Sequence, residues 1–260
     1  MSLAEKPRKR RTGLRAFIVI LVILVLLVVA FFVGEALARQ YATGVIQKQM
    51  AKAVGAESPN DVHVSLGSGS FLLQYLGGDI QHVAVNADPV TVEGITGSLK
   101  IRASDVPTDL DKPVGTLRVG VVIPVSSLSA KIAAVPQLKS LGVSLKPAGK
   151  NLQFSGILAV FGQKIPIGVT ATPHVVAGKP GLTLDKILLG KNQIPVTQFE
   201  AVVPGLASVL KSGASLCIAP SLPKEFVLTG VAVTGQNVVF ALDGDGAKLN
   251  DTSLSQKGTC

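Results

Sequence analysis

Residues 16–34 read AFIVILVILVLLVVAFFVG and contain no charged or strongly polar side chain over nineteen positions. As an α-helix with a rise of about 1.5 Å per residue, such a segment crosses a hydrocarbon core of about 30 Å. We therefore predict that residues 16–34 form a transmembrane anchor or the apolar part of a signal sequence. This segment organises the chain, because the residues before it and after it lie on opposite sides of a membrane.

The flank before this segment is basic. Residues 1–15 carry six Lys and Arg residues against one Glu, within a chain whose formal net charge is +9. Positive flanks of apolar spans stay in the cytoplasm. We therefore predict a cytoplasmic basic tail at residues 1–15 and a single-pass protein of the cell membrane. From Glu35 onward the chain is expected on the outer side, which is periplasmic or extracellular.

Cleavage of the segment is the alternative. Ala36-Leu37-Ala38 has the small-x-small form of a signal-peptidase site, so the domain would be secreted to the periplasm after cleavage near Ala38, before Arg39. The apolar part of a signal peptide is usually about 7–15 residues long. An apolar run of nineteen residues exceeds that length, which favours the uncleaved anchor.

Composition limits the classes of protein to consider. Hydrophobic residues make up 47% of the 260 residues and charged residues 16%, which excludes a disordered chain. Aromatic residues are scarce, with 9 Phe, 2 Tyr and no Trp, so a stacking surface for nucleic acid is not expected. The length suits one exported domain, at residues 35–250, followed by a tail at residues 251–260.

The exported part has the pattern of an α+β domain that is mainly antiparallel. Residues 35–54 place Leu37, Tyr41, Val45, Met50 and Val54 at mostly three- to five-residue spacing, which predicts an amphipathic helix. Short aliphatic runs bounded by Gly, Pro, Asn and Asp predict strands. The expected strands are Val62–Leu66, Ile80–Ala87, Gly94–Ala103, Thr116–Ile123, Leu152–Val160, Lys164–Thr172, Leu182–Leu189, Phe226–Thr234 and Val238–Leu242. Further helices are expected at Phe71–Leu76, Val125–Ala134 and Val196–Lys211.

Two pairs of these strands are expected to form hairpins. Phe161-Gly162-Gln163 and Gly235-Gln236-Asn237 are three-residue connections in which a glycine supplies the positive φ. Each connection joins two aliphatic runs, so the flanking strands are predicted to pair in antiparallel fashion.

Motifs for catalysis and for metal binding are missing from the sequence. His63, His82 and His174 stand singly, and no nucleophile elbow or phosphate-binding loop occurs. We therefore predict a protein that is not an enzyme and has no metal site, no cofactor and no catalytic residue. An enzyme that acts on lipoglycans stays open as a further option, since a pair of carboxylates cannot be recognised before folding.

The two cysteines follow the apolar segment, where an oxidising compartment permits a disulfide. We predict that Cys217 pairs with Cys260 and so ties the C-terminal tail to the domain, the alternative being two free thiols. If formed, the bond would stabilise the domain by about 4 kcal/mol in the chain-entropy model.

Several short motifs resemble one known family in sequence and in order. These are SFLLQYLGG at residues 70–78 followed by IQHVAV at 80–85, FGQKIPI at 161–167, and LPKEF at 222–226 before VAV at 231–233. Over about residues 36–250 the chain is similar to the actinobacterial LmeA-like phospholipid-binding proteins. The resemblance implies a cell-envelope protein with an elongated sheet-and-helix fold that resembles tubular lipid-binding domains. It also implies a family whose named member is linked to elongation of the mannan on lipoglycans.

We therefore predict a non-enzymatic phospholipid-binding protein of the cell envelope that supports mannan elongation or lipid transfer. Its expected partners are a phospholipid or related lipid, the membrane and an envelope glycosyltransferase. Aliphatic strands either line a cavity for acyl chains or form a plain core. Under the first interpretation the cavity is lined by Val121, Ile123, Leu158 and Val160, and the headgroup is bound by Lys100, Arg102 and Arg118. The alternative is a membrane-anchored structural or partner-binding protein with a closed core and no ligand.

Overall fold

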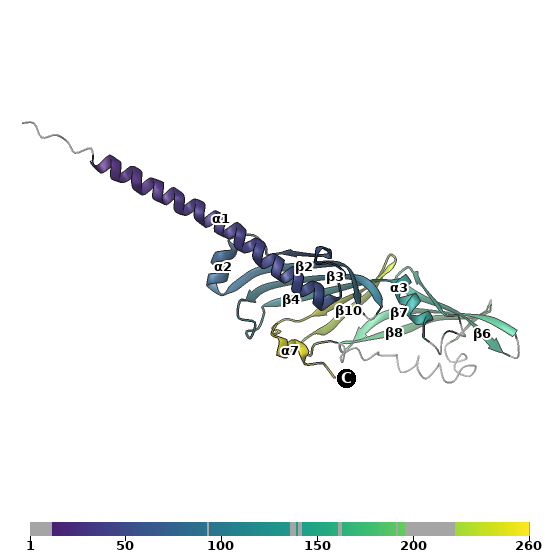
Figure 1. Ribbon diagram of the computed structural model, residues 1–260. Coiled ribbons are helices and arrows are strands. Elements are labelled where there is room, and N and C mark those ends of the chain that lie inside the picture. The colour runs from purple at the N-terminus through teal and green to yellow at the C-terminus, as the bar shows by residue number, and fades with distance from the viewer. Residues whose placement is uncertain are drawn as a thin grey trace, which may run out of the picture.

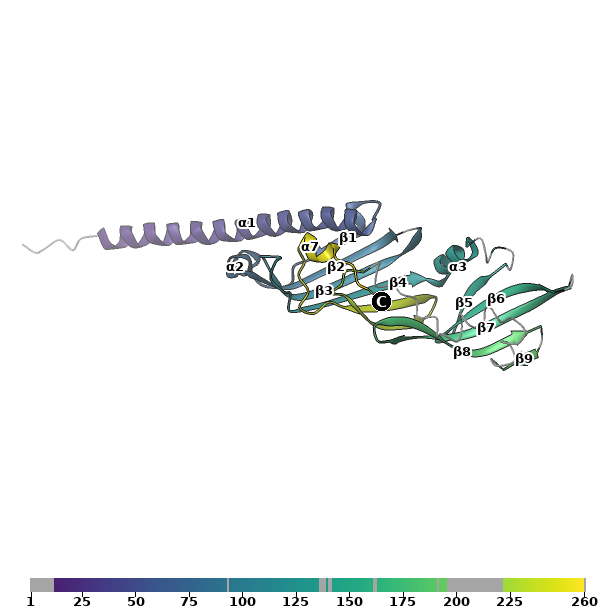
Figure 2. The ribbon, with the colours of Figure 1, turned by 90° about the horizontal axis from the view of Figure 1, so that it is seen from below.

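A single long helix begins the structure, which is a computed structural model. The structure describes residues 12–92, 94–135, 139, 142–160, 163–190, 192–195 and 222–259. Helix α1 (Thr12–Val54) is 43 residues long, and its N-terminal part projects beyond the rest of the molecule (Figures 1 and 2). The large apolar side chains from Val19 to Val33 are each 39–66% exposed. By length and composition the helix can cross a membrane, and its most apolar part is not buried inside the described chain.

Two antiparallel sheets follow one another along the long axis of the molecule (Figures 1 and 2). The first sheet has six strands in the order β1-β2-β3-β4-β11-β10. They are β1 (Val62–Ser65), β2 (Asp79–Val92), β3 (Ile95–Pro107), β4 (Thr116–Pro124), β10 (Val227–Thr234) and β11 (Asn237–Asp243). The second sheet has five strands in the order β5-β6-β7-β8-β9. They are β5 (Ser144–Ala148), β6 (Asn151–Val160), β7 (Gln163–Val176), β8 (Lys179–Leu189) and β9 (Asn192–Ile194).

Short helices cap these sheets. They are η1 (Pro59–Asp61), α2 (Phe71–Gly77), α3 (Val125–Ala133) and α7 (Asp251–Ser255). Helix α3 follows β4 directly and leads to the second sheet, while β10 contacts β7 and β8. The C-terminal tail pairs with the chain before β10. Lys257 forms an isolated antiparallel β-bridge with Pro223, and the Gly258 amide donates to the Leu222 carbonyl at 3.1 Å.

The α+β class, the N-terminal helix and the antiparallel sheets are confirmed. Each predicted strand and the helices predicted at Phe71–Leu76 and Val125–Ala134 have counterparts in the structure. Both hairpins have a two-residue connection in place of three, because Gln163 already pairs with Val160 and Asn237 with Thr234. The helix expected at Val196–Lys211 lies outside the described residues. Cys217 and Cys260 also lie outside them, so the disulfide stays a prediction.

Among the described residues, four apolar clusters hold the domain together. The last turns of α1 place Ala51 against Val62 and Val85, which covers the β1–β2 side of the first sheet. A cluster around Val114 and Leu117 closes the other end of that sheet. A third cluster spans the junction of the two sheets, and a fourth lies within the second sheet. The first sheet therefore has an inner face, covered in part by α1, and an outer face.

The packed side of α1 differs from its most apolar side. Leu37, Tyr41 and Val45 are 62%, 77% and 36% exposed, whereas Ala51 is 4% exposed against the sheet. The amphipathic helix is present, but three of the apolar residues that defined it face away from the domain.

Candidate functional site

Rows of apolar side chains cross the inner face of the six-stranded sheet. Residues directly opposite each other on paired strands point to the same face. One row is Ala87, Leu99, Val121, Phe240 and Val231, and the next is Val85, Ile101, Val119, Leu242 and Leu228. Ala87, Val85, Leu242 and Leu228 are buried, whereas the other members are half-buried. We call the four half-buried members of the first row, Leu99, Val121, Phe240 and Val231, the apolar row.

The apolar row continues into the junction between the sheets. Val231 and Phe240 pack on the cluster that also holds Leu152 of β6 and Val125 of α3. Phe154 belongs to that cluster and to the one inside the second sheet. One apolar layer therefore runs from the first sheet to the second.

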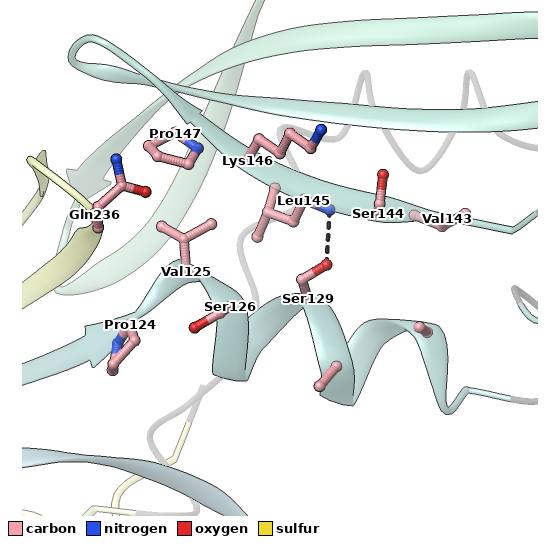
Figure 3. A pocket seen from close by; sticks show the side chains of 12 residues that line it. Pro124, Val125, Ser126, Ser129, Val143, Ser144, Leu145, Lys146, Pro147 and Gln236 are labelled. Carbon is pink, nitrogen blue, oxygen red and sulfur yellow. Dashed lines mark hydrogen bonds between the residues drawn. The ribbon is translucent and has the colours of Figure 1, made fainter.

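A cleft of about 730 Å³ opens between α3 and β5, beside this junction (Figure 3). Binding sites for small molecules have about 300–1,000 Å³. Val125 and Leu145 contribute both to the cleft wall and to the apolar cluster at the junction, so the cleft adjoins the apolar layer. Polar groups in the lining come from Ser126, Ser129, Ser144, Lys146 and Gln236. The Ser129 hydroxyl accepts a hydrogen bond from the Leu145 amide at 2.9 Å, which fixes β5 against α3.

The structure divides the residues that were predicted to line a lipid cavity between the two sheets. Val121 and Ile123 lie on the inner face of β4, both half-buried, with Ile123 opposite Val238. Leu158 and Val160 lie on β6, and their side chains are outside the described part of the structure. The structure thus brings together Val121 and Ile123 alone among these four residues, within the part that it describes.

The predicted headgroup residues gather on the outer face. Arg102 is directly opposite Arg118, and Lys100 is opposite Gly120. Successive side chains of a strand point to opposite faces, so the sheet itself separates these three cations from Val121. Lys100 and Arg102 make no ion pair with any carboxylate in the described part of the chain.

Arg118 is engaged by acidic neighbours. Its guanidinium donates to Asp245 and lies 3.4 Å from Asp243. The hydrogen bond to Asp245 raises the pKa of Arg118 above its ordinary value. The Leu117 amide, at 2.8 Å, and then Arg118 lower the pKa of Asp245. These contacts balance the positive charge of Arg118 and attach β4 to the segment after β11.

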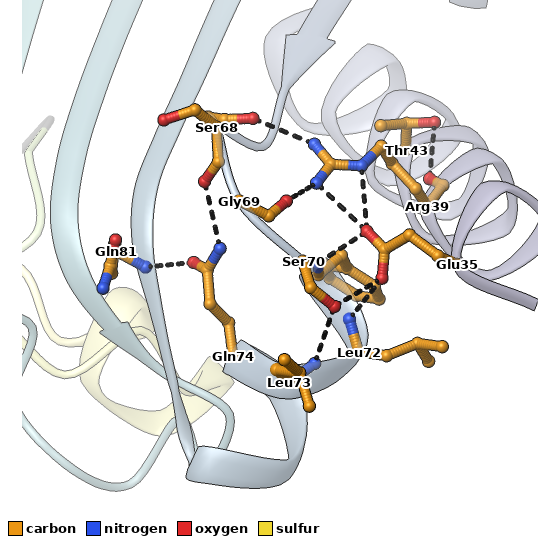
Figure 4. A network of polar contacts seen from close by, with 12 residues as sticks. Glu35, Arg39, Thr43, Ser68, Gly69, Ser70, Leu72, Leu73, Gln74 and Gln81 are labelled. Carbon is orange, nitrogen blue, oxygen red and sulfur yellow. Dashed lines mark hydrogen bonds and ion pairs between the residues drawn. The ribbon is translucent and has the colours of Figure 1, made fainter. Parts of the chain in front are cut away.

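Another polar network joins α1 to α2 and was missed by sequence reasoning (Figure 4). The Glu35 carboxylate accepts from the Phe71 amide at 2.6 Å, the Leu72 amide at 2.9 Å and the Ser70 hydroxyl at 2.9 Å. Arg39 donates to Glu35 and, at 2.9 Å, to the Gly67 carbonyl. The signals were a Glu–Arg pair at i,i+4 directly after the apolar run, and a serine directly before a helical segment.

No group of three His, Cys, Asp or Glu side chains that could hold a metal ion occurs in the described ranges. The chemistry that the described site offers is therefore apolar contact on the inner face, with hydroxyl and ammonium donors at the cleft.

Comparisons with known proteins agree with the resemblance seen in the sequence. The model of a family described as LmeA-like phospholipid-binding matches residues 33–243. No curated protein and no solved structure matches the chain. The matched range begins at the end of the apolar run and reaches the last strand, so it includes the described part of both sheets.

Proposed function

Because the chain belongs to the LmeA-like phospholipid-binding family, we propose that it binds phospholipid on the inner face of its first sheet. Acyl chains would lie along the apolar row and continue to the junction of the sheets, and the headgroup would lie at the cleft between α3 and β5. The family is one of binding proteins, so this function involves no catalytic step.

The observation that carries the proposal is the half-burial of the apolar row. The ends of the inner face are buried by α1 and by the segments around Val114, whereas the middle keeps exposed aliphatic surface. Each buried methylene contributes about 0.8 kcal/mol. A few methylenes therefore outweigh one exposed ion pair, which contributes about 0–1 kcal/mol. On this basis apolar contact supplies most of the affinity.

The cleft supplies donors that suit a phosphate. Ser126, Ser129, Ser144 and Lys146 are among its lining residues. Hydroxyl and ammonium groups donate hydrogen bonds to phosphate oxygens, and the ammonium adds its charge. Headgroup binding by Lys100, Arg102 and Arg118 stays an untested prediction. They lie on the outer face, so we assign the headgroup to the cleft instead.

The proposal includes a retained anchor. Ala36-Leu37-Ala38 lies inside the uninterrupted helix α1, and cleavage before Arg39 would remove Glu35 from the network that holds α2. Both observations support a retained anchor, and we place the domain on the outer side of the membrane because residues 1–15 are basic. Protease added to intact spheroplasts tests this topology. A domain that resists digestion while an external control protein is cut would contradict it.

The family resemblance also motivates a cellular role. We place the protein in the cell envelope, where it would support mannan elongation on lipoglycans, or transfer lipid, beside an envelope glycosyltransferase. Deletion of the gene should then shorten the mannan, and the full chain should restore its length while the Val121→Asp variant should not. Mannan of unchanged length after deletion would remove this role.

Phospholipid binding is tested with two matched variants of the full chain. Val121→Asp places a charge on the inner face, and Val122→Asp places the same charge one residue away on the outer face. Each protein is purified in mild detergent, and its phospholipid is counted by native mass spectrometry. Both variants keep the same transmembrane helix, so lipid held by that helix contributes equally to both counts and does not affect the difference between them.

We expect wild type and Val122→Asp to retain phospholipid, and Val121→Asp to lose it by at least about tenfold while its circular dichroism stays native. Equal retention by both variants would contradict the proposal. If Val121→Asp unfolds, Val121→Trp replaces it, because a larger apolar side chain fills the row without a charge. A folded Val121→Trp protein that holds as much lipid as wild type would favour the closed-core alternative.

A further inference from the structure

Helix α2 exposes its large apolar side chains and turns a polar side chain toward the domain, the opposite of a helix on the surface of a soluble protein. Leu73, Tyr75 and Leu76 are 61%, 56% and 80% exposed. Gln74 instead turns toward the domain, where its side chain donates to the Ser68 carbonyl at 3.2 Å and accepts from the Gln81 amide at 2.8 Å (Figure 4). The helix therefore presents leucines outward and its amide inward. A cluster of large exposed apolar side chains marks a surface that meets another apolar phase.

The position of α2 is fixed at the end of the apolar run. Glu35, the first residue after that run, accepts hydrogen bonds from the first two amides of α2. A Cβ at Gly34 would lie 3.9 Å from Cδ1 of Leu72, so the two helices also approach closely at this level. Figure 1 shows α2 at the end of the first sheet from which α1 emerges. If residues 16–34 span a membrane, α2 lies at its surface.

We propose that α2 is an interfacial membrane helix, whose exposed Leu73, Tyr75 and Leu76 enter the headgroup–acyl boundary of the bilayer that α1 crosses. The bilayer is the occupant that the structure favours, because the Glu35 hydrogen bonds hold this apolar surface at the end of the apolar run. An apolar helix face lies in this boundary layer with its side chains buried, and tyrosine is enriched there because its ring is apolar and its hydroxyl is polar.

A neighbouring loop extends the same surface. The Thr108 amide donates to the carbonyl of Gly78, the residue after α2, at 2.8 Å. Leu110, two residues further on, is 45% exposed. Two contacts, the span and α2, would fix the orientation of the domain on the membrane. This inference goes beyond lipid binding by the inner face and does not depend on it.

Tryptophan fluorescence tests the inference, since the chain has no Trp. Leu76→Trp reports on α2. Val92→Trp is the matched control, because Val92 is 56% exposed at the far end of β2, the strand that begins two residues after α2. At about 3.3 Å per residue, this strand places the control about 40 Å away. Each full-length variant is reconstituted in vesicles of phosphatidylcholine and phosphatidylglycerol, with and without bromine on the acyl chains.

We expect Leu76→Trp to emit at shorter wavelength than Val92→Trp, to be quenched severalfold more by the brominated lipid, and to be shielded from aqueous iodide. Iodide quenching equal to that of Val92→Trp would overturn the inference. Shielding from both iodide and brominated lipid would indicate a protein partner or a second copy, and would overturn it as well. If Leu76→Trp is misfolded, Leu73→Trp takes its place, because Leu73 is exposed on the same helix.

Discussion

The two faces of the six-stranded sheet share every strand and differ in chemistry. Along β4, Val119 and Val121 point to the inner face, while Arg118 and Gly120 point to the outer face. The inner face carries half-buried aliphatic residues that continue into the second sheet. The outer face carries cations, of which Arg118 is bound by two carboxylates. The apolar surface and the charge pairing are therefore separated by the thickness of one sheet.

This separation has a consequence for lipid binding. A phospholipid whose acyl chains lie on the inner face has its headgroup at an edge of that face, and the cleft between α3 and β5 is the described edge site with suitable donors. Lys100 and Arg102 would then serve a different role, such as interaction with lipid surfaces or partners, while Arg118 pairs with Asp243 and Asp245. Variants of matched residues on the two faces should therefore behave differently.

The largest expected difference in stability comes from two glycines. A Cβ at Gly97, on the inner side of β3, would lie 2.5 Å from the Val122 carbonyl oxygen, so Gly97→Ala forces the backbone to move. We expect the free energy of unfolding to fall by about 1–3 kcal/mol, as in overpacked cores. A Cβ at Gly120, on the outer face, would lie 3.8 Å from the Lys100 carbonyl oxygen, which is an ordinary contact. Gly120→Ala is expected to leave stability within about 0.5 kcal/mol or to raise it slightly.

Urea denaturation of both variants measures this difference. Equal losses of stability would mean that the two faces are packed alike, which would weaken the comparison between them.

A smaller difference is expected in headgroup affinity. Lys146→Ala removes the ammonium group at the cleft and should weaken binding of an anionic phospholipid by about twofold to fivefold, the range of an exposed ion pair. The double variant Lys100→Ala/Arg102→Ala removes two cations from the outer face and should leave affinity for a single lipid unchanged. Titration with a short-chain phosphatidylglycerol below its micelle concentration measures both. If only the double variant loses affinity, the headgroup site lies on the outer face and the assignment to the cleft is wrong.

The smallest expected effect is the pH dependence of stability that comes from the Arg118–Asp245 pair. The folded state lowers the pKa of Asp245, so its contribution to stability is present above the ordinary pKa of an aspartate. That contribution is lost as the pH falls through the lowered value. Asp245→Asn should therefore be slightly less stable than wild type at pH 7. This difference in stability should shrink as the pH falls below the ordinary pKa of an aspartate. A difference that stays constant down to that pH would show that the pair does not depend on charge.

Most of the fold could be predicted from hydrophobic pattern alone. Strands such as Thr116–Ile123 and Phe226–Thr234 are aliphatic and bounded by turn residues, and both were found. Strand β5 was missed because it is five residues long and contains Lys146 and Pro147, which lower strand propensity. Strand β9 has three residues, too few for a pattern. Their place in the second sheet depends on pairing with distant segments.

The site could be predicted only in part. Aliphatic strands indicated an apolar surface, and the parity of Arg118 and Val121 within one strand already implies opposite faces. Sequence could not show which parts of the inner face α1 would cover, because the helix packs through its last turns at Met50, Ala51 and Val54 and leaves Leu37 and Tyr41 exposed. The cleft depends on how α3 meets β5, and the Glu35 network joins residues 35 positions apart.

The central claim is that acyl chains lie on the inner face of the first sheet. Its most direct test uses a phospholipid with a photoactivatable diazirine on one acyl chain, reconstituted with the full-length protein, followed by irradiation and peptide mapping. We predict crosslinks within β3, β4 and β11 at inner-face residues such as Leu99, Val121 and Phe240, in addition to those in α1. Crosslinks confined to residues 16–34 and α2 would show lipid only where the protein meets the bilayer, and would contradict the account.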